Sequence, residues 1–535
     1  MDLHNNSYPR MESPGNLFQK YVWILPVLLA AIVYIPILQA PLFDYADPGN
    51  TILNPWTRLP FISAVQEIFS DFKPKFTYQP WVYLSFWIEY RISNGSAWAF
   101  HLISLVWHLL NIGLFGLLLR RLGVTSPFLW FALCLPAIHP LGMETISWVS
   151  NRAILMCTAF MLLSAHLWLM DGGRYRTWAL VAAFMASMTH PIAMSLAPIL
   201  LLLEAYKVWG SALTLPKCKS IVSIALISIL PFAYILYVRI RWMPKGMSHY
   251  NIGEAIGSQL SYWAEMMHIF FTQFIDAEVP VIEYALVSEG THLGYLGVAI
   301  AIILISVFTI LQIRQQKFWM LPVMGLLVFA SVFLIQLHVY PYDAPLLSDR
   351  YFYLPLFVLG LVFLTLGEMF TLSSKYFGFL HVLLLGVICA WTYQVYQQLP
   401  AWQSSTSVWE ASIQHQPAAK KGYHSIYAIQ DEELAVDTSI YNYMKQGLQY
   451  YPEDFFLHHI VGRYWFGIGE YDSAKWYFTN TILLESGHAR SYAYMARIAW
   501  LQQDSMRYAS NRRLAEFHGY KGVLEPQFIE RMYGK

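Results

Sequence analysis

The stretch His139-Pro140-Leu141-Gly142-Met143-Glu144-Thr145-Ile146-Ser147-Trp148-Val149-Ser150-Asn151-Arg152 places a histidine, a carboxylate and a guanidinium between two strongly apolar runs. If this stretch is one helix that begins at Pro140, then Glu144, Trp148 and Arg152 recur every four residues and share a face. Two interpretations follow. The two charges could neutralise one another at the level of the lipid headgroups, or the face could line an extracytoplasmic cavity that handles a charged substrate.

The composition of the whole chain indicates a polytopic membrane protein. Of the 535 residues, 57% are hydrophobic and only 13% are charged, whereas about a quarter of the residues of a soluble domain are charged. The net charge of +1 offers no field for a polyanion, so nucleic acid is not expected as a partner. The cysteines lie at no metal-ligand spacing, and free thiols are expected at Cys134, Cys157, Cys218 and Cys389.

Apolar runs predict about eleven membrane crossings between residues 21 and 399, after a cytoplasmic tail over residues 1–20. Residues 177–206 hold two of these crossings, broken at Thr189-His190-Pro191. The other runs lie at 21–39, 99–119, 126–138, 153–170, 220–238, 293–313, 319–337, 352–369 and 377–398. The run at 21–39 has no small-residue cleavage site, so we expect it to remain as an anchor.

Amphipathic segments at 58–72 and 81–92 predict helices that lie on the membrane surface, and the segment at 256–275 could be of this kind or re-entrant. Basic residues in alternate loops, such as Arg120 and Arg121, are assigned to the cytoplasm. This assignment places the C-terminal part of the chain outside.

From residue 400 onward the chain becomes polar and aromatic, which predicts a separate soluble helical domain over 400–535. The residues at the packing positions of a 34-residue tetratricopeptide helix pair are Val461, Gly462, Trp465, Ala474 and Phe478. About three repeats fit between 417 and 520, and an unspecific helical bundle is the alternative. Such repeats form a concave surface for a polypeptide, where we expect contacts from Tyr464, Trp465 and Tyr492.

Taken in order, these pieces resemble the membrane glycosyltransferases of the GT-C fold. The similar branch joins a multispanning catalytic domain to C-terminal tetratricopeptide repeats, as in the transmembrane-and-TPR O-mannosyltransferases and their bacterial relatives. The motifs that carry the resemblance are Tyr78-Gln79-Pro80, Phe100-His101-Leu102, His139-Pro140, Asn151-Arg152 and Asp349-Arg350-Tyr351-Phe352-Tyr353-Leu354-Pro355. The fold class that this implies is all-α, with a GT-C-like membrane domain followed by a repeat solenoid.

The resemblance implies transfer of a sugar from a polyprenyl-phosphate donor to a protein hydroxyl on the external face. An acidic residue of the first external loop, Asp47 or Asp44, would act as the general base. The residues that could face the donor phosphate are His139, Glu144, Arg152, His190 and Arg350. No cofactor or bound metal is required, although Asp44 and Asp47 together could hold a metal. The compartment would be a bacterial inner membrane with periplasmic repeats, or an endoplasmic reticulum membrane with lumenal repeats.

Two departures from the family pattern keep a second hypothesis open. The first loop has Ala46-Asp47 where relatives usually carry two adjacent acidic residues, and Thr189-His190 stands where many have a lysine and a glutamate. Asp47 also precedes Pro48-Gly49 and could be a turn residue that accepts backbone hydrogen bonds. The second hypothesis is a non-catalytic relative that serves as a membrane scaffold or assembly subunit and docks partner proteins through its repeats.

The number and direction of the crossings predict that the repeats lie on the same side of the membrane as Asp47. A cysteine placed between residues 455 and 520 should therefore react with a membrane-impermeant thiol reagent in intact cells. Labelling that appears only after the membrane has been permeabilised would contradict this topology.

Overall fold

The computed structural model is described here over residues 24–43, 47–70, 78–124, 127–170, 172–197, 199–200, 203–204, 223, 269–275, 282, 284, 348–369, 374–429 and 436–533. These residues form helices and contain no strand, so the all-α prediction is confirmed for this part of the chain. The chain divides into two compact units. The first unit is Met1–Pro280 with Leu286–Gln403, and the second is Val281–Ala285 with Ser404–Lys535.

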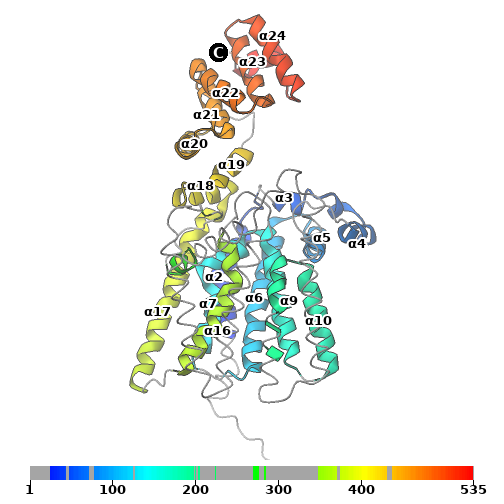
Figure 1. Cartoon of the computed structure of the whole chain (residues 1–535), viewed down its shortest axis with the longest axis vertical. Helices are drawn as coiled ribbons and strands as arrows, with labels where there is room; N and C mark the ends of the chain where they lie inside the picture. Colours follow the sequence, from blue (N-terminus) through cyan, green and yellow to red (C-terminus); the bar gives the residue numbers. More distant parts are fainter. Residues whose placement is uncertain are drawn as a thin grey trace, which may run out of the picture. The chain divides into compact units, whose positions relative to one another are not determined.

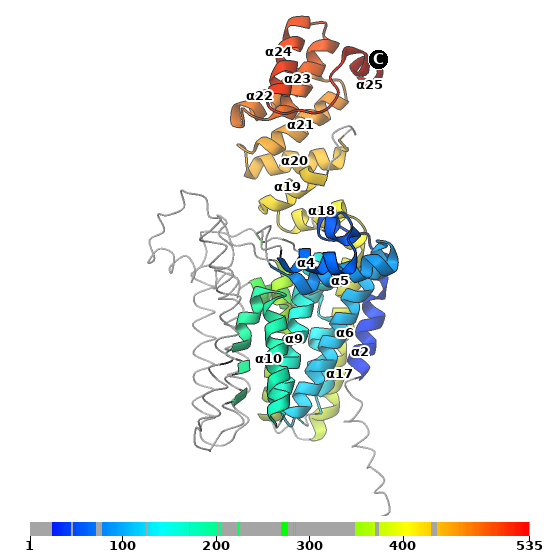
Figure 2. The ribbon, with the colours of Figure 1, turned by 90° about the vertical axis from the view of Figure 1, so that its right-hand side faces the viewer.

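The first unit is a bundle of helices that run side by side (Figures 1 and 2). These helices are α2 (Ile24–Tyr34), α6 (Ala97–Arg121), α7 (Leu129–Ile138), α9 (Arg152–Trp168), α10 (Gly173–Ser187), α16 (Tyr353–Met369) and α17 (Ser374–Gln398). Helix α9 packs against α6 and α10, and α16 packs against α7. Nearly every residue of α7 is buried and apolar, so this helix lies in the interior of the unit.

Short elements gather at one end of this bundle, where α3, α4 and α5 lie together (Figure 1). The other described elements of the first unit are η1 (Ile35–Gln39), α3 (Asp47–Asn50), η2 (Pro55–Arg58), α4 (Phe61–Ser70), α5 (Pro80–Ser93), η3 (Pro140–Gly142), α8 (Met143–Ser147), η4 (Val149–Asn151), η5 (Pro191–Ser195), η7 (Asp349–Phe352) and η8 (Leu399–Gln403). In α4 the faces differ, since Ala64 and Ile68 are buried while Phe61 and Ile62 are exposed.

Two helices of the described part, Ala97–Arg121 and Tyr376–Gln403, are long and apolar enough to cross a membrane. A third crossing is added if the bent pair Leu129–Ile138 and Pro140–Ser147, with 46° between its halves, is one span. The count of about eleven stays a prediction. Its runs at 293–313 and 319–337 lie outside the described residues, and so do nearly all of the run at 220–238 and of the amphipathic segment at 256–275.

The second unit consists of helices that pair in sequence order. They are α18 (Ser405–His415), α19 (Lys420–Ile429), α20 (Thr438–Tyr450), α21 (Phe455–Gly467), α22 (Tyr471–Leu484), α23 (Ala489–Leu501), α24 (Ser505–Phe517) and α25 (Pro526–Tyr533). Helix α21 packs on α22, and α23 packs on α24. The first residues of α21 and α23, at positions 455 and 489, are 34 residues apart, and so are those of α22 and α24, at 471 and 505.

Small residues allow the paired helices of this unit to approach closely. A Cβ atom added to Gly462 on α21 would lie 2.8 Å from the ring of Phe478 on α22. Both Phe478 and Ala474 are fully buried. A side-chain carboxylate also caps the start of α21, where Asp454 accepts hydrogen bonds from the backbone of Phe456 and Leu457.

A similar close approach joins α16 to α7 in the first unit. A Cβ atom at Gly360 would lie 2.6 Å from the carbonyl oxygen of Ala132 and 3.3 Å from the ring of Phe115. Because the nearer atom belongs to a helix backbone, it cannot move aside as the end of a flexible side chain would. Glycine at this position therefore sets the distance between the two helices.

We predict that Gly360→Ala destabilises the protein by about 1–3 kcal/mol, because it forces these two helices apart. The matched control is Gly386→Ala on α17, where an added Cβ would meet no heavy atom within 4 Å and the better helix propensity of alanine should make the change neutral or slightly favourable. Thermal unfolding of the purified protein in detergent measures both effects. An equal loss in the two variants would contradict the assignment.

Candidate functional site

The central segment, residues 139–152, is a succession of short turns and not one helix. The elements η3, α8 and η4 follow one another before α9 begins at Arg152. Trp148 ends α8 because its backbone is extended, with φ −87° and ψ 109°. The prediction that Glu144, Trp148 and Arg152 share one helical face is therefore wrong, and so is the alternative that Glu144 and Arg152 neutralise one another. The physical reason is that each charge is drawn to a different, distant partner.

Glu144 pairs with Arg350, a residue 206 positions further along the chain. The Oε1 atom of Glu144 lies 2.6 Å from Nη1 of Arg350. Its Oε2 atom accepts hydrogen bonds from the backbone N–H of Arg350 at 2.7 Å and from the Ser348 hydroxyl at 2.6 Å. The Glu144 side chain is fully buried. Both carboxylate oxygens thus serve to hold Arg350 and the turn that carries it.

The Arg350 side chain retains 13% of its surface exposed, and aromatic rings flank its guanidinium. Its central carbon lies 4.8 Å from the ring centroid of Tyr351 and 6.0 Å from that of Trp148. Within the described part of the chain, Nη1 makes the side-chain bonds to Glu144 and Ser348, and Tyr351 is a further partner of the guanidinium. This group is the partly exposed cation of the site.

His190 lies in the same neighbourhood, within electrostatic range of the Arg350 charge. It follows the end of α10 and precedes η5, and its Nδ1 atom accepts the backbone N–H of Ile192 at 3.2 Å. The sequence places a proline directly after it, which ends the helix there. The structure thus pairs Glu144 with Arg350 from distant parts of the chain and places His190 within range of the Arg350 charge.

His139 holds the start of the central segment. Its Nδ1 atom accepts the backbone N–H of Leu141 at 3.3 Å, and its Nε2 atom lies 3.1 Å from the carbonyl oxygen of Phe274. The ring stacks on the Phe274 ring with 4.6 Å between centroids. Both ring nitrogens therefore have partners within the chain, and His139 is fully buried.

Asp47 connects the first loop to the central segment. Its Oδ1 atom accepts two hydrogen bonds from Ser150, from the backbone N–H at 2.8 Å and from the hydroxyl at 2.5 Å. Its Oδ2 atom accepts the backbone N–H of Phe43 at 3.1 Å. Asn50 adds a hydrogen bond to the Ser150 hydroxyl at 3.1 Å. Asp47 is fully buried and does act as a turn residue, which is compatible with a further role.

Burial raises the pKa of Asp47 from its ordinary 3.8 to about 6. The hydrogen bonds from Ser150 and Phe43 and the positive charge of Arg152 act in the opposite direction but do not cancel the loss of solvation. A carboxyl group with such a pKa is ionised at neutral pH and is a stronger base than an exposed aspartate. The other predicted base, Asp44, lies outside the described residues, and the prediction that the two could hold a metal stays untested.

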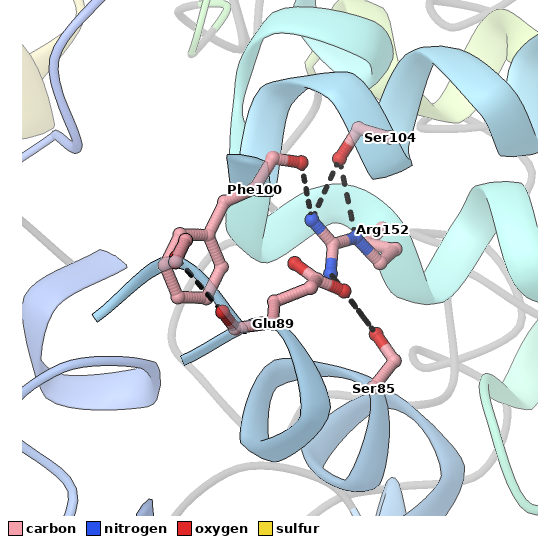
Figure 3. A network of polar contacts seen from close by, with 6 residues as sticks. Ser85, Glu89, Phe100, Ser104 and Arg152 are labelled. Atoms are coloured by element: carbon pink, nitrogen blue, oxygen red, sulfur yellow. Dashed lines mark hydrogen bonds and ion pairs between the residues drawn. The ribbon is translucent and has the colours of Figure 1, made fainter. Parts of the chain in front are cut away.

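Arg152 is fully buried, and its side chain lies at the centre of a network of polar contacts (Figure 3). It forms an ion pair with Glu89 of α5 and donates to the Ser85 hydroxyl at 2.9 Å. It also donates to the Phe100 carbonyl at 2.5 Å and to the Ser104 hydroxyl at 3.2 Å. Each of its three nitrogens is thus engaged inside the protein, so in this structure Arg152 presents no edge to a phosphate.

Glu89 was not selected from the sequence, although the sequence contains a signal for it. On α5 the buried positions Val82, Phe86 and Glu89 recur at helical spacing and form one stripe. A carboxylate on the apolar stripe of a helix needs a cation within reach. The signal therefore predicts a partner for Glu89 but does not tell which arginine it is.

The residues predicted to contact a partner protein lie in the second unit and are half-buried. Tyr464 stacks on Tyr441 with 4.0 Å between ring centroids, and Trp465 meets the same ring edge-on. Tyr492 stacks on His518 with 5.4 Å between centroids. These rings belong to packed aromatic clusters, and their role in binding stays a prediction.

Comparison with known proteins gives little. No protein-family model matches the chain, and no curated protein sequence matches it. A solved structure that matches is ArnT from Cupriavidus metallidurans bound to undecaprenyl phosphate. The match has a TM-score of 0.35 and 13% sequence identity, and covers 94% of this chain and 88% of that chain. A superposition this loose carries no argument about the present chain.

We predict that Asp47 makes the stability of the protein depend on pH. The pKa of Asp47 is higher in the folded state than in the unfolded state. The contribution of Asp47 to the free energy of unfolding is therefore fully present below pH about 4 and is lost as the pH rises through about 6. At about 1.4 kcal/mol per pH unit, the loss amounts to about 3 kcal/mol.

Asp47→Asn should abolish this dependence, whereas Asp504→Asn, at the start of α24 in the second unit, should retain it. The measurement is thermal unfolding in detergent between pH 4 and pH 7. Parallel pH curves for wild type and Asp47→Asn would contradict the prediction.

Proposed function

We propose that the chain is an integral membrane glycosyltransferase of the GT-C type, which transfers a sugar from a polyprenyl-phosphate donor to a protein hydroxyl on the external face. The observation that carries the proposal is the Glu144–Arg350 pair, in which a buried carboxylate holds a partly exposed guanidinium beside His190. The planar fork of arginine pairs bidentately with phosphate oxygens. Arg350 is accordingly assigned to the phosphate of the donor.

In the proposed reaction, Asp47 accepts the proton of the acceptor hydroxyl while the hydroxyl oxygen bonds to the anomeric carbon of the sugar. The bond between that carbon and the phosphate oxygen breaks, and its electron pair remains on the lipid phosphate. Arg350 stabilises the negative charge that develops there. Because Arg350 supplies the positive charge, the proposal requires no bound metal.

The remaining predicted site residues take supporting roles in this proposal. Glu144 orients Arg350, and His190 is assigned a place near the donor phosphate because it feels the Arg350 charge. His139 holds the first turn of the central segment. Arg152 is not assigned to the phosphate, because its hydrogen bonds are made within the chain.

The second unit supports a polypeptide acceptor or partner. Helix pairs that begin 34 residues apart, with a glycine of one helix against a phenylalanine of the next, are features of tetratricopeptide repeats. We assign the unit to this class and propose that it engages the polypeptide on the external side. The compartment is then the periplasm of a bacterium or the lumen of the endoplasmic reticulum.

A second candidate function is favoured by the burial of Asp47. A general base must reach the acceptor hydroxyl, yet the Asp47 side chain is fully enclosed in this structure. A non-catalytic membrane scaffold that docks partners through its repeats would keep such a closed site. Catalysis requires instead that the first loop opens or that the acceptor displaces part of it.

Binding of a polyprenyl phosphate to Arg350 variants tests the donor site. Arg350→Ala should weaken binding about tenfold or more, since a hydrogen bond to a charged group contributes about 1.5–3 kcal/mol. Arg350→Lys keeps the charge but loses the fork, so its affinity should be intermediate. Arg176→Ala, which removes an arginine paired with Glu204 on another part of the unit, should bind as wild type. If Arg350→Ala binds the lipid with wild-type affinity, the assignment of Arg350 to the donor phosphate is wrong.

Sugar transfer by Asp47→Asn separates the two functions. Loss of general-base assistance should lower the rate by ~10²–10⁴ while lipid binding and membrane insertion remain. The assay uses a panel of polyprenyl-phosphate sugars with cellular protein acceptors, together with complementation of a deletion strain. If Asp47→Asn complements the deletion strain fully while truncation at residue 400 abolishes complementation, the protein is a scaffold and not an enzyme.

A further inference from the structure

The enclosed position of Arg152 raises the question of what its charge acts on. Besides the contacts already described, its guanidinium lies over the Phe86 ring at 4.6 Å from the centroid. Its hydrogen bonds reach α5 through Ser85 and Glu89, and α6 through Phe100 and Ser104. Arg152 is thus tied to two helices at the point where α9 begins.

A short covalent path leads from Arg152 to Asp47. Ser150 precedes Arg152 by two residues, in the turn η4, and the backbone N–H of Arg152 bonds to the Val149 carbonyl of that turn. Both hydrogen-bond donors of Ser150 point at Oδ1 of Asp47. Anchoring Arg152 therefore fixes the turn that orients the Asp47 carboxylate.

The Arg152 charge also acts on Asp47 through space. Other titratable groups near this turn are Glu89 on α5, His101 on α6, and Glu144 on α8, which is paired with Arg350. Glu89 is the ion-pair partner of Arg152, and His101 has its Nε2 atom 3.1 Å from the Pro41 carbonyl. Glu89 offsets part of the Arg152 charge, because its carboxylate is in direct contact with the guanidinium.

We propose that Arg152 is a positioning residue for Asp47, which it orients through Ser150 and keeps ionised by its charge, and that Glu89 limits the strength of that charge. The inference rests on the proposed function for its catalytic meaning. The linkage between Arg152 and Asp47 is a property of the fold, however, and it can be measured without any sugar transfer.

The test is an infrared titration of the protonated carboxyl band of Asp47 in the full-length protein, with the band identified by its loss in Asp47→Asn. In wild type the band should disappear as the pH rises through about 6. Arg152→Gln removes the cation and loosens the turn, so the midpoint should move up by about one pH unit. Arg152→Lys keeps the charge and should return most of the way to wild type.

Glu89→Gln should shift the Asp47 midpoint in the opposite direction, and it tests the proposal even if Arg152→Gln does not fold. It retains an acceptor for Arg152 but removes the negative charge that offsets the guanidinium, so the Asp47 midpoint should move down. The matched control is Arg176→Gln, which breaks the pair between Arg176 and Glu204 and should leave the midpoint unchanged. An unchanged midpoint in both Arg152→Gln and Glu89→Gln overturns the proposal.

Binding of a polyprenyl phosphate distinguishes this role from a direct phosphate contact. Arg152→Gln should bind the lipid as tightly as wild type. A tenfold loss of affinity would show that Arg152 contacts the donor phosphate and would overturn the inference. If wild type transfers no sugar, the proposed function fails. The infrared midpoints would still decide whether Arg152 and Glu89 act on Asp47.

Discussion

A charge buried in an apolar bundle must be paired, and the central segment is built around that constraint. Arg152 is completely buried and Glu144 nearly so. Glu89 of α5 pairs with the first, and Arg350 of η7 pairs with the second. Removal of one member of such a pair typically costs 3–5 kcal/mol, because the other charge is left without a partner. The first pair therefore fixes α5 against the start of α9, and the second fixes the turn before α16 against α8.

The turns of the central segment follow from these pairs. A single helix would place Glu144 and Arg152 on the same side, whereas their partners reach them from different elements. The chain resolves the conflict at Trp148, where an extended residue separates α8 from η4. Ser150, in the second of these turns, then holds Asp47 of the first loop. One short piece of backbone thus orients both the proposed base and the proposed phosphate ligand.

The second unit is stabilised differently, because its helices pack mainly on helices that are close to them in sequence. Gly462 meets Phe478 of the next helix, and Asp454 caps the helix that it precedes. Each pair of helices contacts mainly its neighbours, so the spacing of small and large residues along the chain carries most of the information. For this reason the helix pairs could be predicted from residue offsets, whereas the partner of their surface could not.

The sequence by itself determined the helical class and the importance of the stretch from His139 to Arg152, because composition and isolated charges in apolar runs are local properties. It also singled out Asp47, Glu144 and Arg350 as candidates. Only the tertiary structure decided which charges pair, since ion pairs such as Glu144–Arg350 join residues 206 positions apart. The enclosed place of Arg152 was equally invisible in the sequence, because burial depends on how α5, α6 and α9 pack around it and not on its neighbours in the chain.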